Sequence, residues 1–398
     1  MLTDINNVPI DQALKNQGYV IVDDLIPKEM FNKLREACDR VVEKARKGEW
    51  QYRRLVGTQF PPWTEGNDVW GVQHLLHPEL KEPIFAEWYG STKLLEAVQQ
   101  LLDAKQEELQ LELFNLLVNP QESDFDLTWH RDAIPAETLE AEEKQKLTIP
   151  HYGTQWNTAL YDDACLYVVP NSHRRVRTPE EREVTIHDPK SAHMPGQLKV
   201  ELKAGQTVFY DNNILHRASY VSSQKRATLH ASMGTIEGGH HRASCILQHG
   251  LDWMQTDDFK NALVDSLRLP YDNLMRMAQQ AEQHSALKSL KCVFCKEDKP
   301  LDAFSQNQIA KATYNPYASS SSNKKFKTVT CKECASSPNT HLTCMICAKT
   351  QPFEKFAKSQ RKKAEKARCM ECIKKREEED VWASEPDTES EDEWGFLS

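Results

Sequence analysis

The chain has 398 residues, of which 39% are hydrophobic and 27% charged, enough for two or three domains. It contains no run of about 18 apolar residues, which excludes a membrane-spanning helix. An acid follows Met1 closely and no apolar core comes after it, which argues against a secretory signal, and the final Phe396-Leu397-Ser398 is not a peroxisomal tripeptide. We therefore expect a protein of the cytoplasm, the nucleus or both.

Charge is spread unevenly along the chain. The net charge is −9, but residues 287–376 hold 20 Lys and Arg against 7 Asp and Glu, and residues 377–398 hold 10 acids and no base. A basic block beside an acidic tail indicates a domain that binds a polyanion. A solvated charged surface followed by a disordered tail explains the same pattern equally well.

The predicted elements begin with an apolar strand at 18–22 and a helix from Ile26 to Lys47. Residues 50–72 are predicted as loop and 93–102 as helix. Short apolar segments separated by Pro, Gly, Asn or Asp then predict strands at 111–118, 155–161, 165–169, 197–202, 207–210, 213–216 and 227–234. Many short strands separated by turn-forming residues predict a mainly β, double-layer jelly roll or barrel. Residues 253–283 are predicted to be helical with a break at Pro270, and the charged segment 136–148 to be a solvated helix, with a lid as the alternative.

His130 and Asp132 are two residues apart, so in a strand both side chains face one side while Arg131 faces the other. His216 ends the predicted strand 213–216. Two neutral imidazoles and one carboxylate are the facial ligand set of non-haem Fe(II) oxygenases, and they leave about three positions open. A bidentate 2-oxoglutarate would fill two of these positions and dioxygen the third.

The far carboxylate of 2-oxoglutarate needs a cation, and the planar fork of an arginine suits it. Arg226 lies ten residues after His216, on the next predicted strand. A hairpin between the two strands would bring both side chains into one cavity.

The sequence around these residues resembles the phytanoyl-CoA dioxygenase family over about residues 10–240. The similarity rests on Trp129-His130-Arg131-Asp132 and on the segments 156–173 and 203–216. It implies a double-stranded β-helix of the cupin type with flanking helices, and the use of Fe(II), 2-oxoglutarate and dioxygen. By this resemblance, the metal ligands would be His130, Asp132 and His216. The residue that binds the far carboxylate of 2-oxoglutarate would be Arg226.

The resemblance also implies further contacts with 2-oxoglutarate from Asn115 and Trp156, although both residues fit core packing equally well. Asn119 shares the strand parity of Asn115, but a role in the turn is favoured for it. Asn171 stands where the family usually has glycine, a mild departure because asparagine tolerates a left-handed backbone.

Eight of the eleven cysteines form four Cys-x-x-Cys pairs after residue 291. Without a secretory signal, such pairs indicate metal ligands rather than disulfides, and eight thiolates suffice for two tetrahedral zinc ions. The predicted ligands are Cys292, Cys295, Cys331 and Cys334 for the first zinc, and Cys344, Cys347, Cys369 and Cys372 for the second. Cys38, Cys165 and Cys245 are predicted to be buried thiols.

An internal repeat supports this sequential pairing over a cross-braced one. Cys292, Cys295, Pro300 and Phe304 recur 52 residues later, as Cys344, Cys347, Pro352 and Phe356. The doubled pattern resembles the tandem LIM-like zinc domain of the fungal adaptor that couples RNA interference to heterochromatin, over about residues 291–376. The resemblance implies a protein partner and a nuclear setting. The basic run 360–368 could touch nucleic acid, but this is the less favoured alternative.

The sequence thus predicts four parts: a dioxygenase jelly roll with N-terminal helices (1–250), a helical extension and linker (251–290), a tandem zinc domain (291–376) and an acidic disordered tail (377–398). The predicted function is Fe(II)/2-oxoglutarate-dependent hydroxylation of a small or macromolecular substrate that the sequence does not identify. The zinc module would bind a partner. The alternatives are a non-enzymatic scaffold and a chromatin- or RNA-associated adaptor or demethylating hydroxylase.

Overall fold

The computed structural model describes residues 1–57, 68–239, 242–243, 246, 251–286, 289–292, 295–304, 329–334, 341–357 and 367–380. The chain divides into two compact units, residues 1–286 and 287–398. In the described part of the chain, no helix is both long and apolar enough to cross a membrane. The division into four parts predicted from the sequence remains a prediction.

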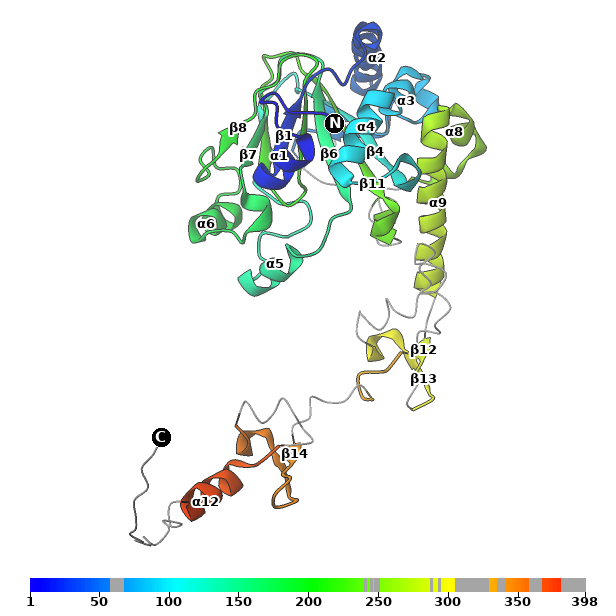
Figure 1. The fold of residues 1–398 in the computed structure, drawn as a ribbon. Coiled ribbons are helices and arrows are strands. Elements are labelled where there is room, and N and C mark those ends of the chain that lie inside the picture. The colour runs from blue at the N-terminus through cyan, green and yellow to red at the C-terminus, as the bar shows by residue number, and fades with distance from the viewer. Residues whose placement is uncertain are drawn as a thin grey trace, which may run out of the picture. The chain divides into compact units, whose positions relative to one another are not determined.

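Two antiparallel sheets form the centre of the first unit (Figure 1). The larger sheet has the strand order β1-β9-β6-β11-β4-β3-β2 and the smaller one β5-β10-β7-β8. The strands are β1 (Tyr19–Val22), β2 (Arg53–Leu55), β3 (Val69–Val72), β4 (Leu109–Val118), β5 (Phe125–Asp126), β6 (Gly153–Ala159), β7 (Leu166–Val169), β8 (Leu198–Lys199), β9 (Thr207–Tyr210), β10 (Leu215–Tyr220) and β11 (Ala227–Thr235). The predicted double-layer jelly roll is confirmed.

Helices cover the outer face of the larger sheet: α4 packs against β6 and β11, and α9 packs against β4. The helices of this unit are α1 (Ile10–Gln17), α2 (Lys28–Arg46), α3 (Ile84–Tyr89), α4 (Thr92–Leu102), α5 (Glu140–Lys146), α6 (Pro179–His187), α8 (Asp257–Ala262) and α9 (Asp265–Ala286). Because this face is covered, β4 and β6 are almost wholly buried along their length, and β4 is mainly apolar. Large aromatic rings fill the layer, and Trp156 lies between Tyr89 and Phe209.

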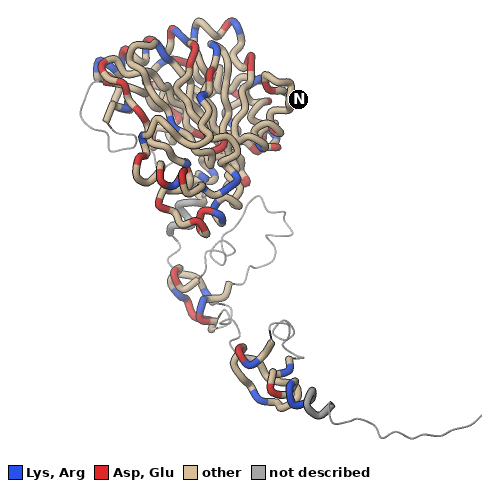
Figure 2. Tube along the Cα trace, turned by 90° about the vertical axis from the view of Figure 1, so that its left-hand side faces the viewer, with Lys and Arg blue, Asp and Glu red and all other residues tan. Residues whose placement is uncertain are grey.

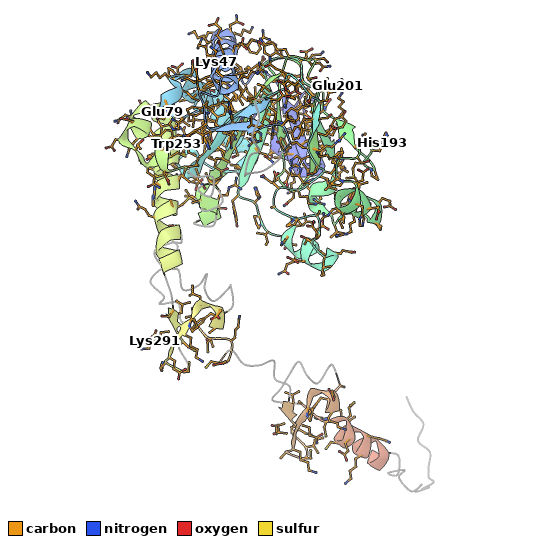
Figure 3. The ribbon with its side chains drawn as sticks, turned by 180° about the vertical axis from the view of Figure 1, so that it is seen from behind. Lys47, Glu79, His193, Glu201, Trp253 and Lys291 are labelled. Atoms are coloured by element: carbon orange, nitrogen blue, oxygen red, sulfur yellow. The ribbon has the colours of Figure 1, made fainter. Side chains whose placement is uncertain are left out.

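Apolar side chains also fill the space between the two sheets. One cluster joins Val168 of the smaller sheet to Val208 of the larger one, and a second joins Tyr220 to Leu117. Figure 3 shows the side chains that fill the first unit, with Trp253 at its rim. The Trp253 ring lies 4.6 Å from the ring of His77, between centroids, and so ties the 3₁₀ turn Asp252–Gln255 to the sheet region.

Three predictions of secondary structure need correction. Residues 53–55 and 69–72 are strands rather than loop: β2 forms the edge of the larger sheet and pairs with β3, and β3 pairs in turn with β4. Helix α9 runs through Pro270 without a break. The proline lies near the start of the helix, and Asn273 holds the next turn by donating to the carbonyls of Glu107 and Leu109.

The third correction concerns the segment 136–148. Its helix α5 is not simply solvated, because the side chain of Glu143 is completely buried and paired with arginines. By contrast, the left-handed turn expected at Asn171 is present, with φ of 65°.

The second unit contains two similar zinc-type motifs. The first has a hairpin of β12 (Ser289–Lys291) and β13 (Asp298–Pro300), and the second a hairpin of β14 (His341–Thr343) and β15 (Thr350–Pro352), followed later by α12 (Met370–Asp380). The two hairpins keep the 52-residue offset, which confirms the internal repeat. Figure 2 shows bases and acids together on both motifs. The serine-rich stretch 319–322, the basic residues 360–366 and the tail after residue 380 lie outside the described residues.

Candidate active site

The predicted iron ligands lie together between the two sheets. His130 follows β5 and forms a single antiparallel bridge with His216 at the start of β10. The Nε2 atoms of His130 and His216 lie 3.4 Å and 3.6 Å from Oδ1 of Asp132. Ligands at about 2.1 Å from one ion and at right angles to each other would be roughly 3 Å apart, so a small inward movement would seat a metal.

Both imidazoles are oriented by the backbone. Nδ1 of His130 lies 2.7 Å from the carbonyl oxygen of Thr128, and Nδ1 of His216 lies 2.9 Å from that of Ile214. A carbonyl only accepts, so each Nδ1 carries the proton and each Nε2 presents a lone pair toward Asp132. This arrangement is the one that metal-binding histidines need.

The protonation of His216 and Asp132 also suits a metal. Burial lowers the pKa of His130, but the hydrogen bond and charge of Asp132 outweigh it and raise that pKa, so a metal would have to displace a proton shared with Asp132. Burial, and then the neighbouring His130, lowers the pKa of His216 to about 4, which keeps that ring neutral. Burial alone raises the pKa of Asp132, but His216 and His130 outweigh it and hold the pKa below its usual range. Gln155 steadies the carboxylate, since its Nε2 donates to Oδ2 of Asp132 at 2.5 Å. A neutral imidazole and an ionised carboxylate are the ligating forms.

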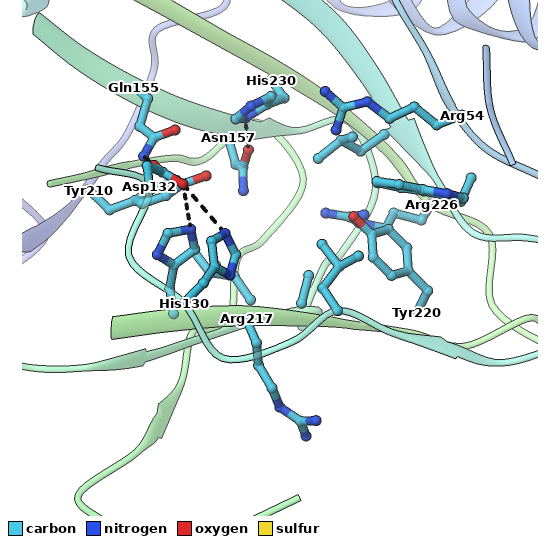
Figure 4. Close-up of a pocket in the computed structure, with 16 residues that line it drawn as sticks. Arg54, His130, Asp132, Gln155, Asn157, Tyr210, Arg217, Tyr220, Arg226 and His230 are labelled. Atoms are coloured by element: carbon cyan, nitrogen blue, oxygen red, sulfur yellow. Dashed lines mark hydrogen bonds and ion pairs between the residues drawn. The ribbon is translucent and has the colours of Figure 1, made fainter. Parts of the chain in front are cut away.

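These residues line one end of a cavity of about 170 Å³, shown in Figure 4. Its other lining residues come from both sheets: Arg54, Trp70, Leu117, Leu127, Asn157, Leu166, Tyr210, Arg217, Ala218, Tyr220, Arg226 and His230. The guanidinium of Arg217 points away from the cavity in Figure 4 and donates to the carbonyl of Lys190. The cavity therefore has a metal-ligand end and, opposite it, an end with Arg54 and Arg226.

Arg226 lies at this far end, as predicted, but not through a hairpin. His216 belongs to the smaller sheet, whereas Arg226 directly precedes β11 of the larger one, so the two face each other across the cavity. Nε of Arg226 donates to Oδ2 of Asp163 at 2.8 Å. Its Nη1 is buried and makes no hydrogen bond to a described residue.

Two further polar groups of the far end have no hydrogen-bond partner among the described residues. They are the hydroxyl of Tyr220 and Nε of Arg54, both buried. The Arg226 guanidinium lies 4.9 Å from the centre of the Tyr220 ring, so these groups are close together. Buried donors without partners are rare, and here they mark the place of a missing acceptor.

Trp156 and Asn115, the other two predicted cofactor contacts, do not line this cavity. Gln155 and Asn157 face the cavity, so the alternation of β6 turns Trp156 to the opposite face, into the helix-covered core. Asn115 shares the cavity side of the larger sheet, being paired with His230, but it does not line the cavity. Its Oδ1 accepts from the backbone N–H of His74 instead.

The residues that sequence reasoning missed are Arg54, Gln155, Asn157, Tyr210, Tyr220 and His230. Nδ1 of His230 lies 2.8 Å from Oδ1 of Asn157, which links two strands of the cavity wall. The parity of β6 was the available signal for Gln155 and Asn157. Asn119 lies elsewhere, with its amide donating to the carbonyl of Gln224.

A second cavity of about 360 Å³ begins directly after the metal-ligand segment. It is lined by Ala133, Ile134, Lys146, Ile149, Pro150, His151, Tyr152, Asn213, Gly238 and Arg242. Most of this lining is apolar, with Arg242 bound to Glu112 and 2.7 Å from Nε2 of His151. The cavity has the character of a pocket for a mainly apolar group.

The eight cysteines form two sequential groups. Cys292, Cys295, Cys331 and Cys334 come together, as do Cys344, Cys347, Cys369 and Cys372, with the sulfur atoms of each group within 4.8 Å of one another. Four thiolates are the ligand set of a closed structural zinc site. Phe304 and Phe356 are buried beside the respective groups, as local core.

Comparison with known families decides the relationship. The phytanoyl-CoA dioxygenase model matches residues 14–228, more than half of the chain. The chain belongs to the phytanoyl-CoA dioxygenase family. The Stc1 domain model matches residues 291–374. Both resemblances predicted from the sequence are therefore confirmed, and the first unit is a dioxygenase-type enzyme fold.

Solved structures of similar fold include AviO1 from Streptomyces viridochromogenes, at 14% identity over 56% of this chain and 93% of that one, with a TM-score of 0.42. EctD from S. alaskensis, solved with 2-oxoglutarate and 5-hydroxyectoine, is 17% identical over 57% of this chain and 75% of that one, with a TM-score of 0.42. The carbocyclase SnoK of nogalamycin biosynthesis is 21% identical over 59% and 87%, with a TM-score of 0.41. No curated protein matches the chain. None of these likenesses to solved structures bears on the substrate of this member of the phytanoyl-CoA dioxygenase family.

Proposed function

We propose that the chain is an Fe(II)/2-oxoglutarate-dependent hydroxylase. One observation above all supports this: a single cavity has three metal-ligand atoms at one end and buried, unpartnered donors at the other. A 2-oxo dicarboxylate has complementary groups, since its 2-oxo acid end chelates a metal and its far carboxylate accepts hydrogen bonds.

In this proposal His130, Asp132 and His216 hold the iron, and Gln155 fixes the orientation of the aspartate. Arg226 receives the far carboxylate of 2-oxoglutarate through Nη1. Iron(II) with 2-oxoglutarate and dioxygen supplies an oxidant for a C–H bond, while 2-oxoglutarate becomes succinate and carbon dioxide. The buried walls keep bulk water away from that chemistry.

The substrate that is hydroxylated would enter the second cavity, next to Asp132. This placement is supported by the chain itself, because Ala133 and Ile134 directly follow the metal-ligand pair and line that cavity. Its apolar walls favour a substrate with an apolar portion near the reacting carbon.

The zinc unit would bind a partner protein, in line with its Stc1 domain match. Exposed apolar side chains on the second zinc motif support this: Met345 and Ile346 between one cysteine pair and Met370 between the other are about half exposed. Large apolar side chains gathered at an exposed turn are typical of an interaction site.

The test is release of succinate from 2-oxoglutarate by the full chain with Fe(II) and ascorbate, without added substrate. Wild-type protein is expected to show this uncoupled turnover, and His130→Ala to reduce it to background together with iron binding. His187→Ala, on the exposed helix α6, is the control and retains both. Absence of iron binding and of succinate from the wild type would favour the scaffold alternative instead.

A further inference from the structure

The cavity contains a second arginine besides the predicted one. Arg54 lies on the short edge strand β2 and reaches the same end of the cavity as Arg226, as Figure 4 shows. Its guanidinium lies 5.1 Å from the centre of the Trp70 ring. The Cδ atom of Arg54 also lies so close to Gly71 that a Cβ there would be only 3.0 Å away. The neighbouring strand therefore fixes the path of this side chain into the cavity.

The charge of Arg226 is already balanced by the protein. Nε of Arg226 lies 2.8 Å from Asp163, and both side chains are almost completely buried. Asp163 in turn accepts from the hydroxyl of Thr228 and from the backbone N–H of Cys165. Arg226 and Asp163 together thus form a closed pair with no net charge, which leaves Nη1 as a donor but not as an uncompensated cation.

Arg54 differs from Arg226 in this respect. Among the residues that the structure describes, no carboxylate lies within ion-pair distance of its guanidinium and no acceptor bonds to it, and its Nε is buried. Burial lowers the pKa of Arg54, and the groups that oppose this effect are the phenols of Tyr220 and Tyr210, not an acid. The Arg54 side chain as a whole is half-buried, so its charge is partly removed from water. A cation in such a place is unfavourable unless a counter-ion or a ligand brings the opposite charge.

We infer that Arg54 and Arg226 together grip the far carboxylate of 2-oxoglutarate, and that Arg54 supplies the net positive charge at that end of the cavity. This inference rests on the proposed function. The hydroxyl of Tyr220, also buried and unpartnered, is the third donor to the same carboxylate.

The charges of the whole site then balance. At the metal end, Fe(II) is offset by the Asp132 carboxylate and by the 2-oxo acid carboxylate of the ligand. At the far end, the second carboxylate of the ligand offsets Arg54, since Arg226 is already matched by Asp163. Arg54 therefore makes the cavity selective for a doubly charged 2-oxo acid over a singly charged one of the same length.

The experiment uses the full chain with Mn(II), which accepts the same ligands as Fe(II), and measures binding of two acids by calorimetry. The acids are 2-oxoglutarate and 2-oxopentanoate, which has the same chain length but no far carboxylate. Arg54→Gln is expected to bind 2-oxoglutarate about 10- to 100-fold more weakly than wild type, the effect of one charge-assisted hydrogen-bonded contact. Its affinity for 2-oxopentanoate is expected to stay within about twofold of wild type.

Arg53→Gln is the matched control, because Arg53 is the next residue on the strand and donates to the carbonyl of Ala45, outside the cavity. It should bind both acids like wild type. Arg54→Lys keeps the positive charge but not the planar guanidinium, so its affinity for 2-oxoglutarate should lie between those of wild type and Arg54→Gln. Thermal melting supplies an independent readout, because ligand-free Arg54→Gln should melt no lower than wild type, yet gain less from 2-oxoglutarate.

The inference is overturned if Arg54→Gln binds 2-oxoglutarate as tightly as wild type, or loses equal affinity for both acids, which would indicate a structural role. Failure of the wild-type protein to bind 2-oxoglutarate at all would overturn the proposed function together with the inference. The two failures are thus distinguished by the wild-type titration.

Discussion

Arg131 and Glu143 form an ion pair in which neither side chain is exposed, with Nε and Oε1 3.2 Å apart. Arg131 stands between the two residues of the His-x-Asp pair and points out of the cavity. Glu143, on helix α5, also pairs with Arg177 and Arg182. A single carboxylate thus pairs with three arginines directly behind the proposed metal ligands.

Substitution Glu143→Gln is expected to destabilise the first unit by about 3–5 kcal/mol, because Arg131 and Arg177 would be left buried without a counter-ion. Urea unfolding measures the change. Iron affinity should weaken as well, since Arg131 also anchors its segment by donating to the carbonyl of Ser172.

The control for this prediction is Glu142→Gln, one residue earlier on the same helix. Glu142 is exposed and, among the described residues, its ion pair is with Lys146, so its substitution should cost less than about 1 kcal/mol. Equal stability of the two variants would show that the buried arginines do not depend on Glu143.

Asp163 and its neighbour Asp162 offer a second matched pair. Asp163→Asn removes the counter-ion of buried Arg226, and we expect a loss of about 3 kcal/mol in the free energy of unfolding of the ligand-free protein. Asp162→Asn removes an exposed ion pair with Lys203 but keeps an oxygen acceptor for the backbone N–H of Ala204, and it should change stability by less than about 1 kcal/mol. A denaturant series on both variants checks this, and a stable Asp163→Asn would argue against a closed Arg226–Asp163 pair.

The zinc assignment predicts two ions per chain. Cys331→Ser should leave one, and adding Cys292→Ser should leave that one unaffected, because both cysteines belong to the same group. The double variant of Cys292 and Cys344 should bind none. Elemental analysis of the purified chains counts the ions, and a different pattern of loss would indicate cross-braced pairing.

Succinate release by the variant that binds no zinc tests whether the iron site depends on the zinc domain. Because residues 1–286 form a compact unit of their own, succinate release should persist in the double variant that lacks zinc. Loss of this activity together with zinc would instead indicate that the units depend on each other.

His230 should make the free energy of unfolding depend on pH. Burial, and then the charge of Arg54, lowers the pKa of His230 from 6.5 to about 3. Between these values the unfolded chain binds a proton that the folded chain does not, so this contribution is complete above pH 6.5 and is lost as the pH falls toward 3.

His230→Gln removes this titration while it keeps a neutral partner for Asn157. The free energy of unfolding, measured from about pH 7.5 down to about pH 5, should therefore fall less steeply in the variant than in wild type. Parallel curves would mean that His230 is protonated as easily in the folded chain as in the unfolded one.

The metal-ligand end of the site could be predicted from sequence because its signals are local. His130 and Asp132 share strand parity, and the ordered succession of His216 and Arg226 follows within one family pattern. The zinc groups were predictable for the same reason, since each Cys-x-x-Cys pair is a local spacing and the repeat fixes the partners.

The far end could not be predicted, because it depends on tertiary pairing. Arg54 lies on an edge strand in a segment whose aromatic and turn-forming residues resemble a loop, and only pairing with β3 places it in the cavity. Trp156 shows the converse. The sequence around Trp156 matches the family. Because side chains alternate between the two faces of β6, however, Gln155 and Asn157 face the cavity and Trp156 does not. A one-residue difference in the alignment reverses which side chain faces the site.

The histidines of the metal end and the arginines of the far end come from different layers, although Tyr220 of the far end lies on the same strand as His216. His216 belongs to the four-stranded sheet and His130 bridges to it, whereas Arg54 and Arg226 come from the seven-stranded sheet. A dicarboxylate bound at both ends would therefore brace one sheet against the other, in addition to the apolar clusters that already join them. Backbone amides of β7 and β10 should then exchange with deuterium more slowly in the loaded protein than in the empty one, far beyond the atoms that the ligand touches.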